Sequence, residues 1–300
     1  MSSMLPFIFA FYPLCLVGFA FAWLLGAKQQ SQHRWAMLAA TCGNMAVFAF
    51  LAGPWVFTSY YLRYVSFVSF ALVIIYSYRR MKAGTAVVKE RSTPWQLLVL
   101  ALLLFTILDA LAIAAYYQPG KPLNLSFPLT SGSYYVLQGG NSVVTNPFHA
   151  LGGTKLALDI VKLNRFGNRA DGIAPQALSN YEIFGEKLFS PCDGAVLSVR
   201  DGLPDNEPGR PDVKHPEGNH IILKCSDAEV FLAHLKRGSI SVTAGEAVVT
   251  EQLLGEIGNS GNTLEPHMHI SATKGGAEIG LSFNGGKLSV NSVVRKVRMP

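Results

Sequence analysis

The chain has 300 residues, of which 50% are hydrophobic and only 15% are charged, whereas a soluble globular chain usually has about 25% charged residues. Its net charge of +6 lies entirely in residues 1–117, which hold eight Lys or Arg and two acidic residues. Residues 118–300 are balanced, with 17 residues of each sign. This division excludes a simple soluble enzyme and a fully disordered chain, and it argues against nucleic acid as a partner.

The first part of the chain carries four apolar stretches of roughly 20 residues, each long enough to cross a hydrocarbon layer of ~30 Å as a helix. We therefore predict that residues 1–117 form a membrane domain with four transmembrane helices in the lipid bilayer. The stretches are Leu5–Leu25, Trp35–Val56, Tyr60–Tyr78 and Trp95–Tyr117.

The basic residues between these stretches predict an orientation. The first loop contains Lys28 and Arg34, and the second contains only Arg63. The third loop is the most basic, with Arg79, Arg80, Lys82, Lys89 and Arg91. Because cytoplasmic loops carry the excess of Lys and Arg, the first and third loops are expected inside. We therefore expect a multi-pass protein of the cell (inner) membrane whose C-terminal domain is periplasmic or extracellular.

From residue 118 the composition changes to Gly, Pro and Asn with short apolar runs. Residues 118–133 are predicted to be a linker, and residues 134–300 an all-β domain with an antiparallel sheet, because short alternating or β-branched runs are separated by turn clusters. The predicted fold is thus a multi-pass α-helical membrane segment followed by an all-β outer domain. Cys192 and Cys225 in this domain are compatible with a disulfide or with two buried thiols.

Six of the seven histidines lie in the outer part of the chain, and the sharpest motif is His267-Met268-His269. Residues i and i+2 of a strand point to the same face. The two imidazoles can therefore share one zinc ion, or one can bind the metal while the other acts on a substrate. Taken alone, the motif is also compatible with two solvated strand histidines.

Five motifs in chain order resemble those of the lysostaphin/LytM-type zinc metallopeptidases, which are peptidoglycan endopeptidases. The resemblance covers residues 134–275 and implies a LytM-like metallopeptidase domain. The motifs are Leu158-Asp159-Ile160, Phe189–Val196, Gly218–Leu223, Leu232–Leu235, and the turn Gly255–Thr263 that leads into His267-Met268-His269.

The resemblance also implies roles for individual residues. Family members hold Zn²⁺ with two histidines and one aspartate, and a zinc-activated water is the nucleophile. Asp159 and His269 correspond to two of the metal ligands. His234 and His267 correspond to the catalytic histidines that orient the water and stabilise the tetrahedral intermediate. The implied function is cleavage of peptide cross-links of peptidoglycan, so that cell-wall peptides are the expected partners.

The first metal motif departs from the family pattern, because Lys155 stands four residues before Asp159 where the family has a histidine. An ammonium group is a poor zinc ligand. We predict that His149 supplies the third ligand instead, since Gly152 and Gly153 would allow the intervening loop to fold back. The alternative is a catalytically degenerate LytM-like domain that binds cell-wall peptides or regulates a partner hydrolase. Both alternatives are compatible with a regulatory partner in the membrane.

Overall fold

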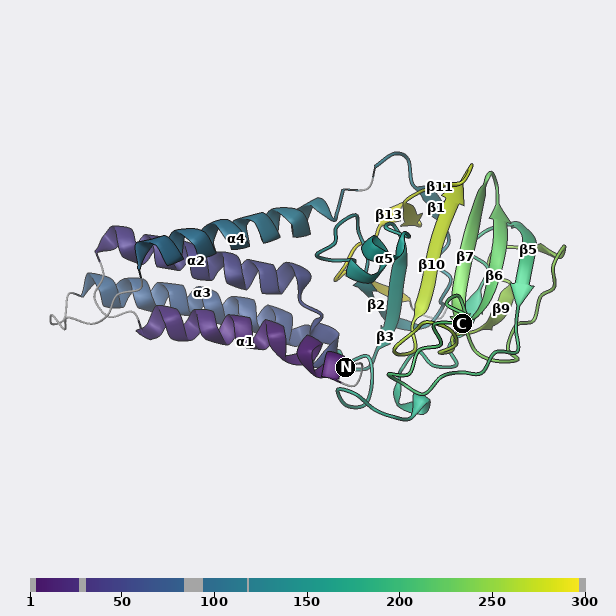
Figure 1. Cartoon of the computed structure of the whole chain (residues 1–300), viewed down its shortest axis with the longest axis horizontal. Coiled ribbons are helices and arrows are strands. Elements are labelled where there is room, and N and C mark those ends of the chain that lie inside the picture. Colours follow the sequence, from purple (N-terminus) through teal and green to yellow (C-terminus); the bar gives the residue numbers. More distant parts are fainter. Residues whose placement is uncertain (1–3, 27–30, 84–93, 118, 297–300) are drawn as a thin grey trace.

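The computed structural model describes residues 4–26, 31–83, 94–117 and 119–296. Figure 1 shows an elongated molecule with a helical bundle at one end and a β domain at the other. The four long helices coincide with the predicted stretches, and each is long and apolar enough to cross a membrane. They are α1 (Leu5–Gly26), α2 (Gln32–Ala52), α3 (Tyr60–Lys82) and α4 (Trp95–Ala114).

The second helix is shorter than the predicted stretch Trp35–Val56. It ends at Ala52 because Gly53 adopts an extended conformation, as expected for a residue that precedes a proline. After Pro54, residues Trp55–Phe57 form a single 3-10 turn, η2, which is fully buried. This turn connects α2 to α3 at the end of the bundle that faces the β domain (Figure 1).

The described basic residues of the first and third loops lie at the end of the bundle opposite the β domain. Arg34 lies near the start of α2, and the last turn of α3 carries Arg79, Arg80 and Lys82; these helix ends point away from the β domain in Figure 1. Lys28, Lys89 and Arg91 lie outside the described residues. Arg63, from the second loop, lies at the other end, where its Nη1 donates to Asn291 O at 3.5 Å.

The β domain is built on a nine-stranded sheet with the order β14-β2-β3-β10-β7-β6-β5-β8, and with β11 beside β10. Neighbouring strands are antiparallel. Every second residue of β6 is buried, as expected where one face of a strand covers a core. The strands are β2 (Gly132–Gln138), β3 (Leu158–Leu163), β5 (Gly194–Arg200), β6 (Asn219–Cys225), β7 (Ala228–Leu235), β8 (Ala247–Val248), β10 (Met268–Lys274), β11 (Ala277–Glu278) and β14 (Val293–Lys296).

Two smaller sheets complete the domain, one with β4 and β9 and the other with β1, β12 and β13. In the second of these, β1 and β12 are parallel, so the domain is mostly but not purely antiparallel. β1 falls in the predicted linker 118–133, and Leu125, Phe127 and Leu129 from that segment are buried in the main core. The elements are β1 (Leu123–Leu125), β12 (Leu281–Phe283), β13 (Gly286–Lys287), β4 (Lys187–Phe189), β9 (Leu253–Glu256), η3 (Leu178–Asn180) and the short helix α5 (Pro147–Gly152).

The β domain is docked directly on the end of the bundle. Tyr60 N donates to Gly167 O at 2.8 Å, and Arg169 N donates to Val56 O at 3.2 Å. One buried apolar cluster is shared by both parts. It contains Ala10, Val56 and Phe57 from the bundle side and Tyr135, Val161 and Leu163 from the sheet. Backbone hydrogen bonds and a common core therefore fix how the sheet faces the helix ends.

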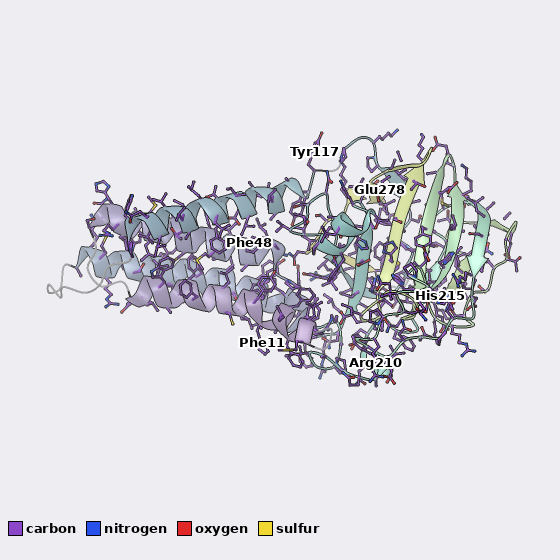
Figure 2. All side chains as sticks on the ribbon, viewed as in Figure 1. Phe11, Phe48, Tyr117, Arg210, His215 and Glu278 are labelled. Carbon is purple, nitrogen blue, oxygen red and sulfur yellow. A yellow bond between two sulfur atoms is a disulfide. The ribbon has the colours of Figure 1, made fainter. Side chains whose placement is uncertain are left out.

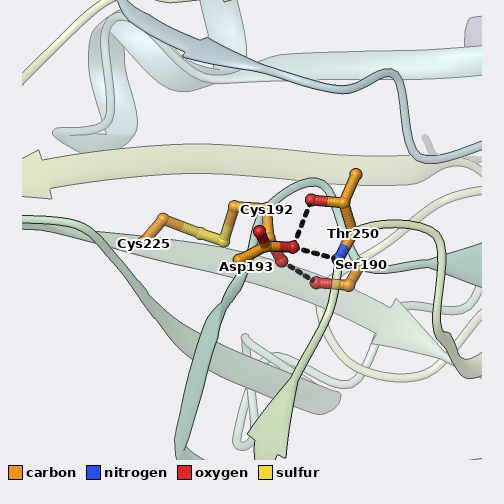
Figure 3. The surroundings of a disulfide bond; sticks show 5 residues. All are labelled: Ser190, Cys192, Asp193, Cys225 and Thr250. Atoms are coloured by element: carbon orange, nitrogen blue, oxygen red, sulfur yellow. Dashed lines mark hydrogen bonds between the residues drawn. A yellow bond between two sulfur atoms is a disulfide. The ribbon is translucent and has the colours of Figure 1, made fainter.

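Cys192 and Cys225 form a disulfide, with their Cα atoms 5.8 Å apart (Figure 3). The bridge links the turn before β5 to the end of β6, where Gly194 pairs with Cys225. Asp193 Oδ1 accepts hydrogen bonds from Thr250 N at 2.7 Å and from Thr250 Oγ1 at 2.8 Å. The disulfide that the sequence left open thus links the neighbouring strands β5 and β6.

Candidate metal centre

The centre begins with two residues on adjacent strands. His269 of β10 and Asp159 of β3 are direct partners in the antiparallel register, which places their side chains on the same face. His269 Nδ1 lies 3.1 Å from Asp159 Oδ1. Both side chains are buried, so the carboxylate and the imidazole meet out of contact with bulk water.

His267 approaches the same carboxylate, although it lies one residue before β10 instead of within the strand. Its Nε2 is 3.4 Å from Asp159 Oδ1. Its Nδ1 donates to the carbonyl oxygen of Glu265 at 2.8 Å. This bond fixes the ring and leaves Nε2 directed toward the cluster.

His149 is brought to the cluster by the short helix α5. The chain returns from α5 to β3 through Gly153, which has a φ of +92° and donates its N–H to His149 O, a conformation that glycine adopts without strain. His149 Nε2 lies 2.9 Å from Asp159 Oδ2. It is nevertheless buried without a hydrogen-bond partner among the described residues, so this close approach lacks the alignment of a hydrogen bond.

His234 completes the group from the end of β7. Its φ of +61° is unusual for a residue other than glycine, and it turns the side chain toward the histidines of β10. Nδ1 donates to Ser260 O at 2.9 Å, which leaves Nε2 as the free lone pair of the neutral ring. The His234 ring centre is 4.9 Å from that of His267 and 5.7 Å from that of His269.

These residues fit a zinc ion. In each of two groups, His149–Asp159–His269 and His234–His267–His269, the possible ligand atoms lie within 4.8 Å of one another. Zinc bonds of about 2.0–2.2 Å in a tetrahedron need ligand atoms roughly 3.3–3.6 Å apart. Two imidazoles with one carboxylate are a typical zinc donor set, and the unpartnered Nε2 of His149 is a buried donor atom that a cation would satisfy.

Burial and neighbouring charges shift the pKa values of these groups in different directions. Burial alone would raise the pKa of Asp159, but the nearby His149 and His267 hold it well below its usual range. Burial and the neighbouring His267 and His269 lower the pKa of His234 well below that of a free histidine. Burial also lowers the pKa of His267, yet Asp159 more than compensates, so that the net direction is upward.

Lys155, which stands at the family's histidine position, does not enter the cluster. The residue is exposed, and it lines a separate small cavity beside Val143 and Leu151. Its backbone N–H donates to Glu278 Oε2 at 3.0 Å. The ammonium group therefore leaves the position beside Asp159 to His149.

Two residues that the sequence analysis assigned no role support the centre. Arg169 Nε and Nη2 each lie 2.6 Å from a carboxylate oxygen of Glu265. The carbonyl oxygen of Glu265 is the acceptor for His267 Nδ1. Arg169 lies in an irregular segment whose sequence has no periodic pattern, and the one available signal was the position of Glu265 just before the His-x-His motif.

A cleft of about 820 Å³ contains the cluster. Asp159, His149, His234, His267 and His269 all line it. His220 does not line this cleft; it packs against Phe231 instead. His215 bonds to Asp212 in an outer loop (Figure 2). The cleft is therefore the place where a substrate would meet the predicted site residues.

Residues 182–281 match the model of peptidase family M23. The match includes His234, His267 and His269, whereas His149 and Asp159 precede it. It confirms the resemblance to the lysostaphin/LytM-type family over that part of the β domain.

Solved structures show similarity at low identity. A zinc-containing peptidase from Vibrio cholerae is 18% identical, over 53% of this chain and 39% of that one, with a TM-score of 0.29. A peptidase M23 structure described as putative, from Pseudomonas aeruginosa, is 18% identical over 59% and 58%, with a TM-score of 0.31. The solution structure of lysostaphin is 18% identical over 44% and 40%, with a TM-score of 0.26. The chain thus spans less than two thirds of the length of each of these three structures. No curated protein matches it significantly.

Proposed function

We propose that this protein is a membrane-anchored zinc metalloendopeptidase that cleaves peptide cross-links of peptidoglycan. One observation carries the proposal. His149, Asp159 and His269, from three different elements, converge in one buried cluster within a chain whose residues 182–281 match peptidase family M23. His149 Nε2 and Asp159 Oδ2 lie 2.9 Å apart, close enough for both atoms to bind one zinc ion.

The proposed roles follow from what each side chain has free. His149, Asp159 and His269 would hold Zn²⁺, which when bound supplies a Lewis acid and activates water at neutral pH. His234 presents Nε2 as a proton acceptor, since its Nδ1 is committed to Ser260 O. His267 is held through Nδ1 by Glu265 O, and its raised pKa favours the protonated ring, whose Nε2 can donate to the negative charge that develops on a peptide carbonyl oxygen.

The membrane part of the proposal rests on the bundle. Helices α1–α4 have the length and hydropathy of membrane spans, and the described basic helix ends lie away from the β domain. We place residues 1–117 in the cell (inner) membrane and the LytM-like domain of residues 134–300 on the periplasmic or extracellular side. The intervening residues 118–133 connect the two and supply β1.

The second candidate function is a degenerate LytM-like module that binds cell-wall peptides or regulates a partner hydrolase. Lys155, at the position of a family ligand, is the observation that favours it. The exposed position of Lys155 weakens this argument, because the ammonium group does not compete with a cation for the space next to Asp159.

Metal analysis of the full-length protein, combined with a cleavage assay on a cross-linked muropeptide, tests the proposal. We expect about one zinc ion per chain and cleavage for the wild type. H149A and H269A should lose both zinc and cleavage. The matched control is H215A, which removes a loop histidine outside the cleft, and it should retain both.

Each other outcome is decisive. A wild-type protein that is purified without chelator and binds no zinc would contradict the metal centre. Zinc binding without cleavage of any cross-linked peptide would favour the regulatory module. Zinc retention in H149A would show that a different residue completes the site.

A further inference from the structure

Two chemically different sets of residues line the cleft that contains the histidine cluster. One set is polar and comes from the outer loops, among them Arg210, Glu217 and Asn262. The other set, here called the apolar end, comes from the first turns of α1 and includes Leu5 and Phe9. The predicted metal ligands line the same cleft, so a bound molecule can contact both sets and the centre.

The apolar end extends along a predicted membrane span. Leu5, Pro6, Phe9 and Tyr12 of α1 all line the cleft, and the seven helical steps from Leu5 to Tyr12 correspond to about 10 Å. Since the 22 residues of α1 measure about 33 Å, the helix matches the ~30 Å hydrocarbon thickness. Ala10, between Phe9 and Tyr12, shares a core with Tyr135 and Val161 of the sheet, so the apolar end lies where the predicted span meets the β domain. Tyr12 donates its hydroxyl to Ala52 O at 3.0 Å, which satisfies this polar atom beside the apolar end.

A second feature favours a position of the active-site side of the β domain near the bilayer surface. Three apolar side chains between β2 and β3, the apolar patch, are exposed: Val143 by 49%, Phe148 by 48% and Leu151 by 82%. The segment that carries them begins at Asn141, whose N–H donates to Ala115 O just beyond the end of α4. Phe148 is part of the cleft wall and precedes His149.

We infer that the substrate is a peptide attached to a lipid chain, and that the chain lies in the apolar end of the cleft while the peptide extends past the histidine cluster. This inference rests on the proposed function and specifies its substrate class. A peptide released into the aqueous compartment has no use for an apolar cleft end that continues into a predicted membrane span. A lipid-linked peptide keeps its chain in an apolar medium and is held near the centre at high effective concentration.

The test uses the full-length protein in vesicles of phosphatidylethanolamine and phosphatidylglycerol. Two probes are compared: a cross-linked muropeptide, and the same muropeptide carrying a hexadecyl chain. We expect kcat/KM for the anchored probe to exceed that for the free probe by on the order of tenfold or more. Equal values would overturn the inference but leave the proposed function intact. Failure to cleave either probe would contradict the proposed function.

Concentration of the anchored probe on the vesicle surface would also raise its rate, so a matched pair of variants is needed. Phe9 lines the cleft, whereas Phe11 is 47% exposed on the same helix and does not (Figure 2). F9W adds bulk at the apolar end and should reduce the ratio of anchored to free kcat/KM severalfold. F11W should leave this ratio at the wild-type value. If F9W and F11W had the same ratio of anchored to free kcat/KM, the lipid chain would not enter the cleft.

Photo-crosslinking gives a readout that does not depend on a variant's folding or on turnover. The anchored probe carries a diazirine at the end of its hexadecyl chain and is irradiated with the wild-type protein in the presence of a chelator. We expect adducts on the cleft-lining residues Leu5, Phe9 or Tyr12 that are suppressed by excess unlabelled anchored probe. Adducts confined to lipid-facing residues such as Ile8 and Phe11, unaffected by the competitor, would overturn the inference.

Discussion

Arg169 and Glu265 form a buried ion pair in which two guanidinium nitrogens each lie 2.6 Å from a carboxylate oxygen. The guanidinium carbon is also 3.6 Å from the centre of the Phe57 ring, which belongs to the turn between α2 and α3. The carbonyl oxygen of Glu265 holds His267. A continuous set of contacts therefore joins the end of the helical bundle to a histidine of the candidate centre.

This relationship predicts that E265Q strongly destabilises the protein. Arg169 is 1% exposed, and removal of one partner leaves its charge buried and uncompensated. We expect the free energy of unfolding to fall by about 3–5 kcal/mol, measured by denaturant unfolding of the full-length protein in detergent. The control is E207Q, which removes a pair with Arg210 whose side chains are 69% and 78% exposed. That change should cost less than about 1 kcal/mol, and equal losses in the two variants would contradict the prediction.

K155A should leave both zinc content and stability close to those of the wild type. Its side chain is exposed and lies outside the cleft, and substitutions of this kind usually change stability by less than about 0.5 kcal/mol. Zinc stoichiometry and thermal unfolding of the full-length variant check this. If K155A bound zinc much more tightly than the wild type, the lysine would be an inhibitory charge at the centre, as the degenerate alternative supposes.

Loss of the Cys192–Cys225 disulfide should destabilise the β domain without dismantling the centre. The cysteines are separated by 33 residues, and closing a loop of that length stabilises a fold by about 3–4 kcal/mol in the chain-entropy account. C192S/C225S should lose roughly this much free energy of unfolding, and reductant should have the same effect on the wild type. C15S, which changes a free cysteine, should have no such effect, and an unchanged stability in C192S/C225S would contradict the bridge.

Zinc retention should decline as the pH falls. The midpoint of this decline should lie below the pKa of an ordinary histidine. Binding requires neutral imidazoles and an ionised carboxylate. Burial lowers the pKa of His269 from its usual value of 6.5, and neighbouring histidines hold the pKa of Asp159 well below its usual range. The binding-competent form is therefore present above the lowered His269 pKa and is lost as the pH falls through it. Competition with a chromogenic chelator across pH 4–8 measures this, and release centred above pH 7 would contradict it.

Part of the fold could be predicted because it depends on local patterns. The four apolar stretches predict α1–α4 through hydropathy and length alone. Short β-branched runs such as Val230–Leu235 and Gly194–Val199 predict strands of the sheet, since alternation of apolar residues needs no knowledge of the partner strand. The parallel pairing of β1 with β12 could not be predicted in this way, because it joins segments that are far apart in the chain.

The amino-acid sequence by itself determined which residue types are available: the apolar spans, the His-x-His motif, and a carboxylate within the Leu158–Ile160 strand. Only the tertiary structure decided that α5 carries His149 to Asp159 while Lys155 remains outside, that Arg169 meets Glu265, and that the cleft ends on the first turns of α1. The physical reason is the separation along the sequence between the residues that interact. Periodicity and composition reflect interactions between residues that are close in the sequence. The geometry of the centre depends instead on strand register, a turn at Gly153, and the docking of the sheet on the helix ends.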